Sequence, residues 1–330
     1  MGITHHVATN GFSVSDLVRV GAELALGVAP VDLSAQSVET PIYAGTLLAH
    51  EVQPGLTATA FDVTYLSTRE FVVDMQPALV CGLLLRGDAD PMEVGSHGSV
   101  VQRFERPVLY GFGKTTRCRR MCIADRHCRT AGFILRRSFF ERFGGDIADD
   151  GLSVLRDFLD VDFRTEALAR SPRLVEIANR ALDHPYTGEL GQLFLESNTL
   201  SYLVEVAELL KQERRVVALM GRRHYDRVME ARDILDADLI APPRTLELAR
   251  RVGVNVTTLQ ANFKAVFDTT IFGYVRDQRL LMARALLIDH GLTIAEAGYR
   301  VGFASPAAFT AAYRRRFGHP PGKELAREQR

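Results

Sequence analysis

The chain has 330 residues, of which 47% are hydrophobic and 24% charged, and its basic and acidic side chains balance to a formal net charge of zero. That length allows two domains with separate cores, and four cysteines in so long a chain exclude a small disulfide-stapled scaffold. The sequence lacks a run of about 20 apolar residues and a secretory signal, so we expect a cytoplasmic protein with no membrane partner.

Residues 1–140 are expected to form a β-rich domain. Short runs rich in β-branched and aromatic residues cover 56–66, 69–75, 79–87, 99–104, 107–113 and 130–136. Turn residues separate these runs, as at Pro54-Gly55 and Asp90-Pro91. Regularly spaced short strands predict an antiparallel sandwich or barrel, and a barrel can close around a small ligand.

Four residues within this domain could bind a metal. Cys118, Cys122, His127 and Cys128 offer thiolate and imidazole ligands, but their spacing does not repeat the paired arrangement of zinc ribbons. If Cys118 and Cys122 share a strand, their side chains face the same side. The pattern favours buried thiols in a core, with a redox or metal switch as the alternative. We therefore expect no metal and no cofactor.

The same domain offers little support for catalysis. His97 follows Glu93 by four residues but has no second histidine nearby, whereas a metal-binding cupin needs a close histidine pair. We expect His97 to be an exposed loop residue. The dinucleotide, phosphate-loop and serine-hydrolase motifs do not occur in the sequence, so we expect no catalytic residues and no enzyme.

Residues 141–215 change to a helical pattern. Ser171 and Pro172 predict an N-cap and a first helical residue, and a further helix is expected over 189–211. An apolar stripe follows that helix at spacings of three, four and seven: Leu193, Leu200, Val204, Ala207 and Leu210. The stripe is either core or the dimerisation seam of a homodimer. The polar residues from 211 to 221 are expected to form a linker.

Residues 216–330 predict short helices and contain an internal repeat. TLELARRVGVNVTTLQANFKAVFD (245–268) and TIAEAGYRVGFASPAAFTAAYRRRFG (293–318) share one plan. Five positions of the first copy correspond in this plan to five of the second: Thr245 to Thr293, Gly253 to Gly302, Leu259 to Phe309, Phe263 to Tyr313 and Lys264 to Arg314. A helix, a tight turn at glycine and a second helix form a helix-turn-helix unit. Its first copy is expected to have a core of Leu248, Ala249, Val252, Leu259 and Phe263.

The charge distribution agrees with a polyanionic partner for this last segment. Residues 221–330 contain 18 Lys and Arg against 12 Asp and Glu, whereas residues 1–220 contain 22 against 28. A basic C-terminal segment after an acidic N-terminal one is expected if only the C-terminal segment binds a polyanion. An accident of surface composition is the alternative.

The segment 222–322 resembles the DNA-binding domain of the AraC/XylS family of bacterial transcription regulators. TIAEAGYRVGFASPAAFTAAYRRRFGHPPG (293–322) follows the signature of that family, and YVRDQRLLMARALL (274–287) resembles its connecting helix. The resemblance implies two helix-turn-helix units on one rigid helix, which bind successive major-groove segments on one face of DNA. It also implies an N-terminal ligand-sensing or dimerisation domain, often a cupin-like barrel. Residues 181–210 are similar to the helical arm of the siderophore-sensing, pyochelin-regulator branch.

The resemblance places DNA-reading residues near the start and middle of each second helix. In the first unit these positions hold Thr257, Gln260 and Ala261, with Thr258 and Lys264 on the same free face. Gln260 can form two hydrogen bonds with adenine, and Thr257 can touch a base or a phosphate.

In the second unit the corresponding positions hold Pro306, Ala307 and Ala311, whose side chains offer no hydrogen bond. Contacts with thymine methyl groups are expected there, together with phosphate anchoring by three arginines: Arg314, Arg315 and Arg316. Alternatively, Pro306 and Ala307 only begin a stable helix. Base specificity is therefore expected mainly from the first unit.

These expectations combine into an α+β multidomain chain. A cupin-like antiparallel β-barrel (1–140) and a helical arm with a linker (141–215) precede an all-α domain with two helix-turn-helix motifs (216–330). The resemblance implies a DNA-binding transcription regulator, an activator controlled by a small-molecule effector. Its expected partners are double-stranded DNA, RNA polymerase, the effector and a second copy of the chain. The alternative is a ligand-binding or enzymatic barrel whose C-terminal helices mediate assembly.

Overall fold

The computed structural model describes residues 5–21, 26–30, 40–87, 90–143, 152–289 and 291–324. The chain divides into two compact units, Met1–Lys211 (unit 1) and Gln212–Arg330 (unit 2). The division into three parts, with a separate arm, stays a prediction. Within the described ranges, no helix combines the length and the apolar character that crossing a bilayer requires.

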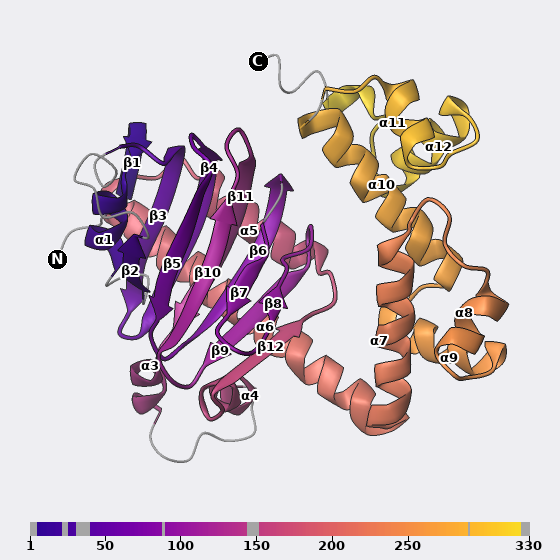
Figure 1. Ribbon diagram of the computed structural model, residues 1–330, viewed down its shortest axis with the longest axis horizontal. Helices are drawn as coiled ribbons and strands as arrows, with labels where there is room; N and C mark the ends of the chain where they lie inside the picture. Colours follow the sequence, from indigo (N-terminus) through magenta and orange to yellow (C-terminus); the bar gives the residue numbers. More distant parts are fainter. Residues whose placement is uncertain are drawn as a thin grey trace. The chain divides into compact units, whose positions relative to one another are not determined.

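Unit 1 is built on two antiparallel sheets, which lie one in front of the other in Figure 1. The larger sheet has the strand order β1 (His5–Phe12), β3 (Tyr43–Gln53), β4 (Leu56–Tyr65), β11 (His127–Leu135), β6 (Ala78–Gly87), β9 (Pro107–Phe112) and β12 (Phe163–Ala167). The smaller sheet has the order β2 (Leu26–Pro30), β5 (Arg69–Met75), β10 (Thr116–Cys122), β7 (Met92–Val94) and β8 (Ser99–Val100).

The cupin-like closed barrel that the sequence predicts is not formed by the described residues. Each sheet keeps two edge strands, β1 and β12 in the larger sheet and β2 and β8 in the smaller one. The chain crosses from one sheet to the other between β4 and β5, and crosses back between β5 and β6. The result is an open two-layer sandwich. Sequence patterns identify strands but not which edges meet, because ladder partners lie far apart in the chain.

Most of the predicted strands are confirmed, but several real strands were not expected. The runs over 56–66, 69–75, 79–87, 107–113 and 130–136 form β4, β5, β6, β9 and β11. The strand β10 was missed because arginines interrupt its apolar residues. Its alternation is nevertheless clear in the structure, where Cys118 and Cys122 are buried while Arg117 and Arg119 are exposed.

The alternation of side chains divides the described part of unit 1 into three apolar clusters. The outer face of the larger sheet packs against helices and forms a cluster that includes Leu79, Phe133, Phe158, Leu174 and Leu203. Between the sheets lie two more. The Tyr65 cluster includes Leu47, Val63, Tyr65, Cys122 and Cys128. The Phe112 cluster includes Met75, Val94, Tyr110, Phe112 and Cys118.

Helices cover the outer face of the larger sheet (Figure 1). The helical elements of unit 1 are α1 (Val14–Gly21), α3 (Arg137–Glu141), α4 (Leu152–Arg156), the 3-10 helix η1 (Asp157–Leu159), α5 (Pro172–Asp183) and most of α6 (Gly188–Met220). The predicted N-cap of α5 is confirmed, since the Ser171 hydroxyl accepts a hydrogen bond from the Leu174 N–H at 3.2 Å. Tyr202 of α6 packs edge-on against Phe133 at 5.8 Å, which fixes α6 to the sheet.

Helix α6 is longer than the sequence predicts. It continues through residues 211–220, where a linker was expected, and ends before Gly221, which has φ of 84°. Its apolar stripe also does not form one uniform face. Leu193 and Val204 are 64% and 60% exposed, whereas Ala207 is buried in the core. Leu200 is half-buried against that core, and the dimer seam stays a prediction.

The four candidate metal ligands, Cys118, Cys122, His127 and Cys128, do not form one group. Cys118 belongs to the Phe112 cluster, whereas Cys122 and Cys128 belong to the Tyr65 cluster. All four cysteines of the chain are buried free thiols, and burial raises the pKa of Cys118 to about 11. Among the residues with described placement, no three side chains of metal-ligand type form a group. His127 and Cys128 open β11, and His97 is an exposed loop residue as expected.

His127 instead takes part in a charged network on the sheet. Its Nε2 lies 2.8 Å from Asp62 Oδ1. Arg129 donates to Asp62 Oδ2 and to Asp183 Oδ1, both at 2.6 Å. Since Asp62 lies on β4, His127 and Arg129 on β11, and Asp183 at the end of α5, this network joins two strands to a covering helix.

Unit 2 is all-helical, as predicted, and it contains two lobes (Figure 1). Its helices are α7 (Arg222–Ala237), α8 (Thr245–Arg251), α9 (Val256–Phe267), α10 (Ile271–Asp289), α11 (Ile294–Arg300) and α12 (Pro306–Phe317). The internal repeat extends one helix further than the sequence analysis recognised. Val228, Ala231 and Leu235 of α7 are matched, at the same spacing, by Leu280, Ala283 and Leu287 of α10.

We expect Asp62→Asn to lower the free energy of unfolding by about 1 kcal/mol at neutral pH, the typical contribution of a hydrogen bond. The hydrogen bond with His127 is the largest influence on the pKa of Asp62 and holds it below its ordinary value. The stabilisation is therefore present above the pKa of an unfolded aspartate, about 3.9, and is lost as the pH falls toward the lower folded pKa. Urea unfolding between pH 7 and pH 3 measures it.

Asp74→Asn is the control for this prediction. Asp74 meets Arg117 at 3.0 Å on the surface, where the Arg117 side chain is 64% exposed, so its loss should be smaller. A destabilisation by Asp62→Asn that stays constant from pH 7 to pH 3 would contradict the account.

Candidate nucleic-acid interface

The second helix of each repeat begins at a side-chain cap. Asn255 Oδ1 accepts a hydrogen bond from the Thr258 N–H at 2.7 Å, and Ser305 Oγ accepts one from the Ala308 N–H at 3.2 Å. These caps satisfy backbone donors that a helix start leaves unpaired. They fix where α9 and α12 begin, and therefore which side chains lie on their first exposed turn.

A glycine ends the first helix of each repeat. Gly253 has φ of 68° and Gly302 has φ of 84°, values that a residue with a Cβ rarely adopts. The following N–H reaches back to an earlier carbonyl, from Val254 to Ala249 and from Phe303 to Gly298, both at 3.0 Å. This is the Schellman arrangement, and it turns the chain sharply enough for the two helices to pack.

The two turns differ by one residue, and this corrects one predicted correspondence. Asn255 follows Gly253 by two positions, whereas Ser305 follows Gly302 by three. Thr293 is the N-cap of α11, in a capping box with Glu296. Thr245 is instead the first helical residue of α8, so the two threonines are not equivalent.

The predicted core of the first unit is confirmed. Leu248, Ala249, Val252, Leu259 and Phe263 are each at most 1% exposed. In the second unit Phe309 and Tyr313 are fully buried at the positions of Leu259 and Phe263. Each second helix is therefore anchored on one side, and its opposite side faces solvent.

The free face of α9 carries the residues predicted to read DNA. Thr257, Gln260, Ala261 and Lys264 are exposed, and Thr258 is half-buried. An amide, a hydroxyl and an ammonium thus lie along one side of the helix. These groups can donate to or accept from base edges and phosphates.

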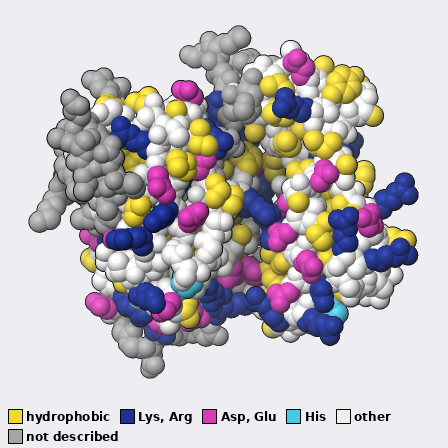
Figure 2. Space-filling view, in the orientation of Figure 1, with side chains coloured by type: hydrophobic (Ala, Val, Ile, Leu, Met, Phe, Trp, Pro, Cys, Tyr) yellow, Lys and Arg dark blue, Asp and Glu magenta, His cyan; other side chains and the backbone are white. Residues whose placement is uncertain are grey.

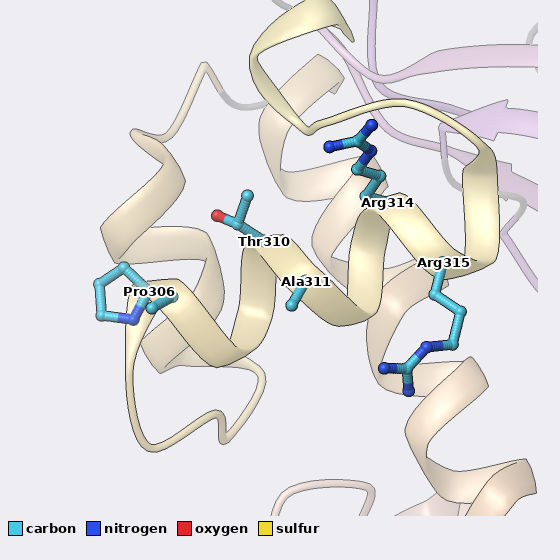
Figure 3. A pocket seen from close by; sticks show the side chains of 6 residues that line it. Pro306, Thr310, Ala311, Arg314 and Arg315 are labelled. Atoms are coloured by element: carbon cyan, nitrogen blue, oxygen red, sulfur yellow. The ribbon is translucent and has the colours of Figure 1, made fainter.

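The free face of α12 is a shallow open groove of about 860 Å³, lined by Pro306, Ala307, Thr310, Ala311, Arg314 and Arg315. Figure 3 shows the Arg314 and Arg315 side chains leaving the helix toward opposite sides, beyond the small residues of its first turns. Thr310 was not among the predicted readers. It occupies the position of Gln260, and counting from the shared Ala261 and Ala311 would have identified it. Its hydroxyl adds one hydrogen-bonding group to this face.

Arg316 lies apart from this groove. Its Nε is 3.9 Å from Asp277 Oδ2 on α10, and its guanidinium carbon lies 5.3 Å from the centre of the Phe317 ring. The side chain is 24% exposed. The three consecutive arginines are therefore divided, with two on the exposed face and one against the connecting helix.

Arg279 of α10 joins the two helix-turn-helix units within unit 2. Its Nε donates to the Leu239 carbonyl at 2.6 Å and its Nη2 to the Ile240 carbonyl at 2.9 Å, both in the connection between α7 and α8. Its Nη1 donates to the Gly302 carbonyl at 3.3 Å, in the turn of the second unit. One guanidinium thus holds the loop before α8, in the first helix-turn-helix unit, against the turn after α11, in the second.

The surface of unit 2 carries its cations unevenly. Figure 2 shows Lys and Arg side chains gathered around α8 and α9. In α12 the exposed cations are confined to the last turns, where Arg314 and Arg315 follow an apolar first half. The two helix faces therefore offer different chemistry to one polyanion.

Comparison with known proteins identifies two matching families. The family described as "Regulatory protein PchR N-terminal domain" matches residues 44–220, and a helix-turn-helix domain family matches residues 248–327.

Individual relatives are similar over shorter lengths. The regulatory protein PchR of Pseudomonas aeruginosa is 33% identical over 122 residues, which are 36% of this chain and 41% of PchR. The virulence regulon transcriptional activator VirF of Yersinia enterocolitica is 27% identical over 104 residues, 32% of this chain and 37% of VirF. The chain thus matches less than half the length of each of these relatives.

Among solved structures, an AraC-type transcriptional regulator from Chromobacterium violaceum is 31% identical. The alignment covers 31% of this chain and 91% of that one, with a TM-score of 0.30.

We expect Arg279→Ala to lower the free energy of unfolding by about 1–3 kcal/mol, because it removes hydrogen bonds from a charged donor. Amide hydrogen exchange of the full chain should become faster at residues 239–241 and 302–304 together. Arg276→Ala on the same helix is the matched control, since Arg276 Nε lies 3.9 Å from the neighbouring Asp277. Equal losses in both variants would contradict the joining role of Arg279.

Proposed function

The chain belongs to the family of the PchR-type N-terminal domain joined to an AraC-type helix-turn-helix domain, and on this premise we propose that it regulates transcription by binding specific DNA sequences. The observation that carries the proposal is the pair of capped helices, α9 and α12, each buried on one side and exposed on the other. An α-helix of this kind fits the major groove, where base edges are distinguishable.

In the first unit, Gln260 is the proposed base reader. Its exposed amide can form two hydrogen bonds with adenine, and it lies one turn into α9. Thr257 and Lys264 lie before and after it on the same face, where they can bind the phosphates that flank the contacted base. This unit supplies most of the proposed sequence choice.

In the second unit, Arg314 and Arg315 are the proposed phosphate anchors. Their divergence from α12 (Figure 3) suits contacts with phosphates on the two sides of a groove. Ala307 and Ala311 can meet thymine methyl groups, and Thr310 can contribute a single hydrogen bond. We assign the second unit more affinity than specificity.

The remaining features of the proposal follow from the family. Unit 1 is proposed to bind a small-molecule effector that controls DNA binding. The protein is also proposed to activate transcription, as the name of the relative VirF states for that protein, and to do so together with RNA polymerase. The protein is proposed to act on the chromosome, in the bacterial cytoplasm.

The alternative is an enzymatic or ligand-binding β-domain whose C-terminal helices mediate assembly. The names of the relatives describe regulators, which supports regulation over catalysis. A gel-shift experiment with the DNA upstream of the gene decides between the two classes.

A homodimer is also proposed, through the exposed part of the stripe on α6. Leu193 and Val204 remain uncovered by unit 1, and Leu190 nearby is 58% exposed. Apolar side chains at helical spacing on an exposed face can meet their own copy across a two-fold axis. Leu200, half-buried against the core, lies at the margin of this face.

We expect Gln260→Ala and Arg315→Ala to weaken DNA binding in different ways. Gln260→Ala should cost about 1–3 kcal/mol on the selected site and relax base preference at one position. Arg315→Ala should weaken selected and random DNA alike and reduce the slope of log K against log salt by about one. Binding titrations of the full chain at several salt concentrations measure both effects.

Arg316→Ala is the matched control for Arg315→Ala, because Arg316 lies against α10 and should leave the salt slope unchanged. A uniform loss on all sequences from Gln260→Ala would refute its role as a base reader.

We expect Val204→Glu to convert a dimer into a monomer without unfolding unit 1, since a buried charge would face its own copy across the seam. Sedimentation velocity measures the change. Leu219→Glu provides the control, because Leu219 is 89% exposed on the same helix and lies outside the stripe. A Val204→Glu protein that remains folded and dimeric would rule out this seam.

A further inference from the structure

A charged side chain lies in the interior between the two sheets of unit 1. Along β10, residues 116, 118, 120 and 122 alternate with the outward-facing Arg117, Arg119 and Met121. Arg120 therefore points toward the larger sheet, as its buried neighbours Cys118 and Cys122 do. On the two flanking strands it pairs with Phe71 of β5 and Met92 of β7.

Arg120 divides the apolar interior. Cys118, on one side of it, belongs to the Phe112 cluster, and Cys122, on the other, belongs to the Tyr65 cluster. The charge of Arg120 influences Tyr110 of the first cluster and Tyr65 of the second. The guanidinium thus occupies the boundary between two apolar groups of side chains.

Two nitrogens of the Arg120 guanidinium are left without a hydrogen-bond partner by the described residues. Its Nε and Nη2 are both buried and have no hydrogen-bond partner in the parts of the chain that the structure describes. An unpaired cation in an apolar interior destabilises the fold, so the position of Arg120 calls for another explanation. The Tyr43 hydroxyl, whose ring meets Tyr65 edge-on at 6.2 Å, is buried and unpaired as well.

The neighbouring side chains do not provide Arg120 with a hydrogen-bonded anion. Burial raises the pKa of Tyr65 and raises that of Tyr110 to about 12, against the opposing charge of Arg120. Burial likewise raises the pKa of the Cys122 and Cys128 thiols. These groups are therefore neutral at pH 7. Asp90 forms an ion pair with Arg126 through Oδ1, and its buried Oδ2 has no hydrogen-bond partner among the described residues. Asp90 therefore contributes its charge to the surroundings of Arg120 but no hydrogen bond.

We propose that Arg120 binds the carboxylate of an organic acid between the two sheets, with the apolar body of the acid against the Tyr65 and Phe112 clusters. A guanidinium presents two parallel N–H groups that match a carboxylate, and Nε with Nη2 is such a pair. The apolar residues on both sides favour a hydrophobic body over a sugar or an inorganic ion. The inference gives a chemical class to the effector and rests on the proposed function only in calling the bound acid an effector.

Thermal unfolding of the full chain at pH 7.5 tests the proposal with three acids and their neutral amides: benzoate and benzamide, 4-phenylbutyrate and 4-phenylbutyramide, octanoate and octanamide. A ligand that binds the native state raises the unfolding midpoint with concentration. At least one acid should raise the midpoint of the wild-type chain in this manner, and its amide should not. Arg120→Met should abolish this difference, and Arg120→Gln replaces it if the methionine variant does not fold.

Arg119→Met is the matched control, since Arg119 is the next residue on β10 and faces outward; it should respond as the wild type does. The proposal is overturned if every acid acts as its amide does, or if the Arg120 variant still responds, which would place the anion elsewhere, for example at the basic face of α12. Gel shifts on the same samples separate the two ideas. If the wild-type chain binds DNA but does not prefer any acid over its amide, only the Arg120 site is refuted. If it prefers an acid but does not bind DNA, only the proposed function is refuted.

Discussion

The arrangement of unit 2 depends on one helix that belongs to two cores. Ile271, Tyr274 and Val275, near the start of α10, are buried in the core of the first helix-turn-helix unit. Leu280, Ala283 and Leu287, further along, are buried in the core of the second. A helix of 19 residues spans about 28 Å at 1.5 Å per residue, which is close to the 34–36 Å of one DNA turn. The helices α9 and α12 are both packed against α10 and therefore cannot move independently. The hydrogen bonds of Arg279 to both helix-turn-helix units strengthen this constraint.

Within this common frame the two units have diverged in chemistry. Phe263 packs edge-on against Tyr274 in the first core at 5.5 Å. Tyr313, which replaces Phe263 in the second core, donates a hydrogen bond to the buried Glu324 at 3.1 Å. Glu324 also lies 3.0 Å from Arg284 Nε on α10. The second helix-turn-helix unit therefore adds a charged anchor to aromatic contacts of its own, such as Tyr313 with Phe317 at 4.4 Å. On the exposed side, α9 presents an amide whereas α12 begins with small apolar residues.

Sequence reasoning succeeded where the contacts are local. The helix-turn-helix units follow from residues a few positions apart, such as Leu248 with Leu259, and from the glycine that permits the turn. The start of α5 followed from Ser171 and Pro172 for the same reason. The pairing of β11 with β4 and β6 instead joins residues far apart in the chain. Because local patterns do not reveal such pairing, the prediction of a closed barrel was wrong. Thr310 was missed although the predicted pairs Leu259 with Phe309 and Phe263 with Tyr313 already place it at the position of Gln260. The orientation of Arg120 required knowledge that β10 is a strand.

The constraint imposed by α10 can be examined directly by hydroxyl-radical footprinting of the full chain on a DNA fragment that it binds. The account predicts two protected regions on one face of the duplex, with centres about one helical turn apart, and protection of both that is lost together when the salt concentration rises. A single protected region, or two regions on opposite faces of the DNA, would contradict it.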